Sequence, residues 1–231
     1  MVEIIKPAKY VNPTNFRDFL SRQHSIFRKD FVCSDQVERE GITCTLPDVE
    51  HCYYVALIHP DTVNLEMAKF SIDIASKVSA VSYVPSNIHT TLANGYITRG
   101  EFTTNFDIIN KLSETVQGIK DKISPLVYHA WLINRGGVIA AAYGNEGFFN
   151  IAQSIHQGAK SRDLELNFPW GAHMSASRFS EPRNPEQTKD LISFINQAKP
   201  IGQSMPSKIT FGTAFTTKTE FRLDECGSIE F

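Results

Sequence analysis

Two short motifs, each a histidine followed two positions later by a hydroxyl residue, hold the residues of this sequence best suited to chemistry. The first joins His89 to Thr91, and the second joins His173 to Ser175. Because side chains on a β-strand alternate between its two faces, each histidine would point the same way as its hydroxyl partner. If two such strands faced each other, two imidazoles and two hydroxyls would surround one small anion.

Two imidazoles are suited to a phosphodiester displacement, in which one proton leaves the attacking oxygen and another reaches the leaving oxygen. With an ordinary pKa of about 6.5, one imidazole can be neutral and the other protonated near neutral pH. The hydroxyls of Thr91 and Ser175 can donate hydrogen bonds to the non-bridging phosphate oxygens. We expect neither a metal nor another cofactor, and either histidine can act as base or acid depending on how the ester is bound.

An internal repeat relates the two motifs. The two histidines are 84 residues apart, and the same shift lays Tyr53–His59 on Gly137–Tyr143 without a gap, and Pro85 on Pro169. The order of strand, helix, proline and motif strand is the same in both units. A duplicated unit related by a pseudo-twofold axis would bring equivalent strands, and therefore the two histidines, face to face.

Hydrophobic periodicity predicts the elements that position these motifs. Strands are expected at 53–58, from the first motif towards 97, at 126–133, at 138–143, at the second motif, and in a strand-rich tail at 208–223. Helices are expected at 65–78, 106–119, 148–159 and 185–198. The sequence Asn134-Arg135-Gly136-Gly137 predicts a hairpin turn.

Residues 1–50 are expected to form a partly helical N-terminal extension in front of a main domain at 51–231. An apolar stripe predicts a helix that packs on that domain, and it consists of Phe16, Phe19, Leu20, Ile26 and Phe27. Basic residues among these aromatics leave a contact with RNA open as an alternative to a solvated face: Arg17, Arg22, Arg28 and Lys29.

Composition narrows the functional classes. The chain has 231 residues with a net charge of −2, which argues against broad binding of duplex DNA through a basic surface. No stretch approaches a membrane-spanning length or the apolar core of a signal peptide, so we expect a cytoplasmic monomer with reduced cysteines. Cys44, His51 and Cys52 leave an irregular zinc site open as an alternative.

The two motif segments resemble those of the 2H phosphoesterase superfamily, which includes bacterial 2′-5′ RNA ligase-like proteins and cyclic nucleotide phosphodiesterases. The segments are Asn87–Leu92 and Phe168–Ser175, and the resemblance covers roughly residues 53–222. It implies an α+β fold, a bilobal duplicated unit with antiparallel sheets lining a central cleft. The lobe repeats would lie at about 53–97 and 137–180.

The resemblance also assigns roles. The family's four motif positions fall on His89, Thr91, His173 and Ser175. Some members carry an arginine five residues after the second histidine, which Arg178 matches as a phosphate contact, whereas Asn94 stands at that place in the first motif. On a regular strand, the odd spacing from His173 would place Arg178 on the opposite face.

The implied activity is a metal-independent phosphodiesterase acting on a nucleotide or RNA phosphodiester. The bond would be a 2′,3′-cyclic phosphate, a 2′-5′ or 3′-5′ linkage, or a cyclic oligonucleotide. Two alternatives stay open: an RNA end-joining ligase of the same family, and a nucleotide- or RNA-binding module without turnover. Trp170, beside the second motif, is a candidate for stacking on a base.

Overall fold

The computed structural model describes residues 3–5, 12–28, 34–43, 46 and 48–231. Its helices are α1 (Phe16–Ile26), α2 (Ser34–Glu40), α3 (Asp61–Ala75), α4 (Phe106–Gln117), α5 (Glu146–Lys160) and α6 (Pro185–Gln197), with a 3₁₀ turn at Pro85–Asn87. Its strands are β1 (Glu3–Ile5), β2 (Val49–Ile58), β3 (Ala80–Ser82), β4 (His89–Arg99), β5 (Leu126–Asn134), β6 (Gly137–Tyr143), β7 (His173–Phe179), β8 (Gly202–Ser204), β9 (Lys208–Thr217) and β10 (Phe221–Glu230).

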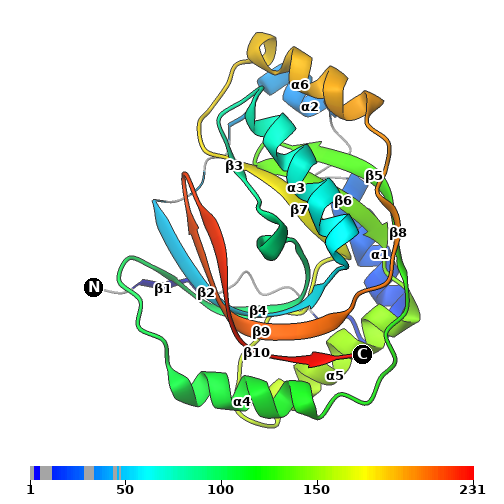
Figure 1. Cartoon of the computed structure of the whole chain (residues 1–231), viewed down its shortest axis with the longest axis vertical. Coiled ribbons are helices and arrows are strands. Elements are labelled where there is room, and N and C mark those ends of the chain that lie inside the picture. Colours follow the sequence, from blue (N-terminus) through cyan, green and yellow to red (C-terminus); the bar gives the residue numbers. More distant parts are fainter. Residues whose placement is uncertain (1–2, 6–11, 29–33, 44–45, 47) are drawn as a thin grey trace.

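These strands form one curled antiparallel sheet with two halves. Its order is β10-β9-β2-β4-β7-β6-β5-β8, with β1 added to β4 and β3 added to β7. The halves meet between β4 and β7, where Thr90 pairs with Met174. Figure 1 shows α4 and α5 at one end of the molecule and α2 and α6 at the other, with α3 between them in front of β6 and β7.

The two halves repeat one unit, as the 84-residue spacing predicted. β2, α3 and β4 correspond to β6, α5 and β7, and each helix crosses to the other half, α3 packing on β7 and α5 on β4. The alignment of the two halves is not free of gaps, in contrast to the prediction. Ile58 of β2 pairs with His89 and Ala141 of β6 pairs with His173, so equivalent residues of β2 and β6 are 83 positions apart, whereas the two histidines are 84 apart. The mixed helices and antiparallel strands confirm the predicted α+β fold class.

The predicted helices and the hairpin turn are present, whereas the shortest elements were missed. β1, β3 and β8 have three residues each, too few to display a period of two, and α2 has seven. The tail divides into β9 and β10, which pair with each other. Asn134 pairs with Gly137 to close the predicted hairpin. Among the described helices, none is long and apolar enough to cross a membrane.

The N-terminal helix α1 packs on the second half of the molecule. Its N-cap is Asn15, whose side chain accepts from the backbone N–H of Asp18. Phe19 is fully buried and its ring lies 5.8 Å from that of Phe148 and 6.0 Å from that of Phe168. The prediction of a packing face is therefore confirmed, while the division of the chain at residue 50 stays a prediction.

Candidate functional site

The two motifs begin the two strands at the junction of the sheet. His89 and Thr91 are half-buried on one face of β4, and His173 and Ser175 are half-buried on β7. The residues between them, Thr90 and Met174, are fully buried on the other face and pair with each other. An antiparallel register around that pair makes His89 and His173 diagonal neighbours, for which the spacing is roughly 7–8 Å.

Each imidazole is held by the carbonyl two residues before it. Nδ1 of His89 lies 2.8 Å from the Asn87 carbonyl oxygen, and Nδ1 of His173 lies 3.1 Å from that of Gly171. A carbonyl can only accept, so Nδ1 carries the hydrogen in both rings and Nε2 keeps its lone pair. The repeat has therefore placed the same tautomer on both strands, with Nε2 as the atom able to take a proton.

Burial lowers the pKa of both histidines to about 4. The carbonyl hydrogen bonds oppose this shift, whereas the positive charge of Arg178 adds to it in both cases. A positive charge on His89 would also lower the pKa of His173, so the two imidazoles interact electrostatically. Both rings are thus neutral at pH 7, in contrast to the neutral and protonated pair expected from ordinary pKa values.

A β-bulge turns Arg178 towards the motif face. Along β7 the residues paired to consecutive positions of β6 are Ser175 and Ser177, so Ala176 is an extra residue. Ala176 and Ser177 are consequently both buried, and Arg178 is half-buried like His173. The expectation from regular alternation, that Arg178 lies on the opposite face, is wrong because one extra residue reverses the parity of the strand.

Arg178 reaches across towards the first motif. Its guanidinium lies 5.8 Å from the ring centre of Phe221, which is itself stacked on His89 at 5.6 Å and 10°. β4 carries the same kind of bulge at Leu92, so Asn94 also turns to this face, where its side-chain oxygen accepts from Asn167 at 3.0 Å. The two halves therefore place a cation and an amide at equivalent positions.

Aromatic rings flank both imidazoles. Trp170 is stacked on His173 with ring centres 4.0 Å apart at 26°, and Phe27 from the end of α1 meets Trp170 edge-on at 5.8 Å. The role of Trp170 against a base stays a prediction, because its ring already covers one face of His173. Sequence reasoning missed Phe221, for which the only signal was the alternation of threonine and phenylalanine in the tail.

The other histidines in the described residues have partners elsewhere. His59 is 1% exposed behind the motif strand, where Nδ1 lies 2.8 Å from Ser204 Oγ and Nε2 lies 3.0 Å from Thr90 Oγ1. His51 stacks on Phe102. Cys44 of the alternative zinc site, like Lys29 among the basic residues, lies outside the described residues. In the described part of the chain, no group of three or more His, Cys, Asp or Glu residues could hold a metal ion.

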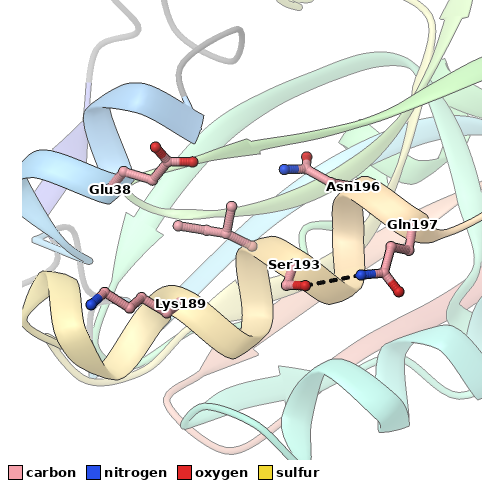
Figure 2. Close-up of a pocket in the computed structure, with 6 residues that line it drawn as sticks. Glu38, Lys189, Ser193, Asn196 and Gln197 are labelled. Atoms are coloured by element: carbon pink, nitrogen blue, oxygen red, sulfur yellow. Dashed lines mark hydrogen bonds between the residues drawn. The ribbon is translucent and has the colours of Figure 1, made fainter.

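One cavity lies away from the motifs, at α2 and α6 (Figure 2). It measures about 540 Å³ and is lined by Glu38, Lys189, Ile192, Ser193, Asn196 and Gln197. Gln197 donates to Ser193 across one helical turn at 3.0 Å. None of the sequence-predicted site residues lines this cavity.

No family model and no curated protein matches the sequence. Among solved structures, E. coli LigT complexed with 3′-AMP is similar over 78% of this chain and 98% of that chain, with a TM-score of 0.51 and 14% identity. A structure described as a phosphoesterase is similar over the same shares, with a TM-score of 0.50 and 13% identity. At these identities the likeness is one of fold.

Proposed function

Because the chain has the LigT-like fold of the 2H phosphoesterases, as its two motifs predicted, we propose that it is a phosphodiesterase acting on a nucleotide or short RNA. The bond would be a 2′,3′-cyclic phosphate, a 2′-5′ or 3′-5′ linkage, or a bond of a cyclic oligonucleotide. We further propose that it works as a cytoplasmic monomer. A nucleotide substrate accords with the 3′-AMP in the LigT complex.

The observation that carries the proposal is the pair of imidazoles with matching tautomers on adjacent strands. Each has Nε2 free to exchange a proton, and each has a hydroxyl two residues on, on the same face. Proton transfer by a positioned side chain contributes about 10²–10⁴-fold to a rate. Two such groups supply both transfers of a displacement at phosphorus, so the mechanism needs no metal.

The sequence of events follows from the charges. A bound phosphodiester is negative and raises the pKa of the nearby imidazoles, so that one of them takes up a proton. The neutral imidazole then accepts the proton of the attacking water as its oxygen bonds to phosphorus. The protonated imidazole gives its proton to the leaving oxygen as that P–O bond breaks. Thr91 and Ser175 donate to the non-bridging oxygens, and Arg178 balances their charge.

The test is turnover of a substrate panel in EDTA by the wild type, His89→Ala and His173→Ala. The panel holds a 2′,3′-cyclic nucleotide, 2′-5′ and 3′-5′ dinucleotides and a cyclic dinucleotide. We expect hydrolysis of at least one substrate by the wild type and a loss of about 10²-fold or more in each variant. His24→Ala is the matched control, because His24 is an exposed histidine on α1.

Equal activity in all four proteins would overturn the proposal, as would a requirement for a divalent cation. Joined RNA ends as the product would favour the ligase alternative. Tight binding of a panel member with no product from the wild type would favour a binding module.

A further inference from the structure

The N-terminal helix reaches the second motif through one buried side chain. Gln23 on α1 is 0% exposed, its Nε2 donates to the Ala142 carbonyl at 3.1 Å, and its Oε1 accepts from the Ala172 N–H at 2.9 Å. Ala142 and Ala172 also bond each other through the backbone at 2.9 Å. The amide of Gln23 thus completes the hydrogen bonding of β6 with the residue before His173.

The bond to Ala172 acts directly on the group that holds the imidazole. The N–H of Ala172 and the carbonyl of Gly171 belong to one peptide unit, and that carbonyl accepts from His173 Nδ1. A peptide unit is planar, so holding its N–H also sets the direction of its carbonyl. Donation by the N–H polarises the carbonyl as well and strengthens it as an acceptor.

A glycine lets the helix approach this peptide. A Cβ added at Gly171 would lie 3.0 Å from Gln23 Cγ, 3.2 Å from Gln23 Oε1 and 3.3 Å from the Phe27 ring. Any larger residue at this position would press on α1 at the point where Gln23 meets the backbone. Close packing and hydrogen bonding therefore coincide at the same peptide unit.

In the first half, the Asn87 side chain ties the equivalent segment to β10, donating to the Phe221 carbonyl at 2.6 Å and accepting from the Leu223 N–H at 3.2 Å, but the N–H of the peptide itself is held by a local turn. There the N–H of Ile88 shares a peptide unit with the Asn87 carbonyl that accepts from His89, and this N–H donates to the Pro85 carbonyl at 3.3 Å. Pro169 stands 84 residues after Pro85, yet the equivalent N–H, that of Ala172, donates to Gln23. In the second half, the acceptor for this N–H is therefore a side chain of α1, whereas in the first half it is a carbonyl of the local turn.

We propose that Gln23 is a positioning residue for His173, so that the N-terminal helix is a working part of the second half of the site. Its effect on turnover rests on the proposed function, whereas its effect on the His173 imidazole does not. A purely structural role would cost stability and leave the His173 tautomer unchanged.

The test compares three variants with the wild type. Gln23→Met keeps the length of the side chain and loses both hydrogen bonds, while Gln23→Glu keeps an acceptor for the Ala172 N–H. Phe19→Leu is the matched control, because Phe19 lies one turn earlier on α1 and packs on Phe148, Phe149 and Phe168 instead. Circular dichroism establishes that each variant is folded.

The decisive measurement is the tautomer of each histidine by ¹⁵N NMR of the substrate-free protein. We expect Nδ1–H at both rings in the wild type, Gln23→Glu and Phe19→Leu. In Gln23→Met we expect a substantial fraction of Nε2–H at His173 alone, with His89 unchanged. On an active substrate, kcat of Gln23→Met should fall about 10-fold with KM unchanged, the size expected for one hydrogen bond.

An unchanged His173 tautomer in Gln23→Met would overturn the proposal, and so would the same change in Phe19→Leu. If the wild type turns over no substrate, the proposed function fails, but the tautomer measurement still decides the role of Gln23. If the wild type is active and neither tautomer nor kcat changes in Gln23→Met, only the positioning role fails.

Discussion

The two halves of the site hold equivalent imidazoles by different means. Each ring donates from Nδ1 to the carbonyl two residues before it and stacks on an aromatic ring, His89 on Phe221 and His173 on Trp170. The first peptide is held by a 3₁₀ turn of the same strand connection, and the second by Gln23, 149 residues before its partner Ala172. The repeat has thus kept the geometry of the imidazole while the supports around it differ.

The two halves of the site differ more in the charge near the imidazole than in backbone geometry. Equivalent bulges turn Arg178 and Asn94 to the motif face, but Asn94 is engaged by Asn167 and carries no charge. The histidines are therefore symmetric and their electrostatic surroundings are not. We expect this asymmetry to favour one orientation of an anionic substrate.

The largest expected effect is the loss of kcat/KM on replacing either histidine, and it tests whether the two imidazoles are equivalent. His89→Gln and His173→Gln should each lower kcat/KM by about 10²–10⁴-fold, since each removes one proton transfer. The two losses should agree within about tenfold, and the double variant should be little worse than either single one, because the residues act as a unit. Steady-state kinetics on the best substrate measures this. A near-normal rate in one of the two would break the equivalence.

The next effect separates Arg178 from its counterpart. Arg178→Gln should lower kcat/KM by about 10–100-fold, because a hydrogen bond to a charged group is worth about 1.5–3 kcal/mol. Asn94→Ala, at the equivalent place in the first half, should change kcat/KM by less than about threefold. Equal losses in the two variants would show that the asymmetry of charge has no role in catalysis.

The pH dependence of kcat/KM follows from the lowered pKa values of the free protein. Both imidazoles have a pKa of about 4, so both are protonated well below pH 4 and both are neutral well above it. The form with one proton between them is most abundant near pH 4, and kcat/KM should fall as the pH rises from 5 to 7. Arg178→Gln should move this limb to higher pH, because removing the cation raises both pKa values. A profile that is flat from pH 5 to 7 would contradict the lowered values.

The smallest effect is on stability. The pKa of His59 is lowered to about 3, and those of His89 and His173 to about 4, mainly by burial. Between about pH 6.5 and pH 4 the unfolded chain binds these protons and the folded chain does not, so the free energy of unfolding falls as the pH falls. Each histidine contributes at most about 1.4 kcal/mol per pH unit.

Urea titrations at pH 7, 6 and 5 measure this dependence. His89→Gln and His173→Gln should each reduce the slope by a similar amount, because the two rings are buried alike. Unequal reductions would show that one half of the site is more exposed to water than the other.

Much of the fold could be predicted because it depends on local periodicity. The helices α3 to α6 and the strands β2, β4, β5, β6 and β7 are long enough to display their apolar faces. The bulge at Ala176 was not predictable, since nothing in the alternation of β7 announces an extra residue. The face of Arg178 was uncertain for that reason alone.

Two features follow from residue order alone: the two-residue spacing that places each histidine and its hydroxyl on one face, and the 84-residue repeat that makes the motifs equivalent. The groups that contact the motif residues depend instead on how distant segments pack. Phe221 reaches His89 and Gln23 reaches the peptide before His173 because distant segments pack there. Desolvation by that packing also moves the pKa values from about 6.5 to about 4. Strand and helix periods carry no information about such contacts, because they depend on register and on the surfaces that packing buries.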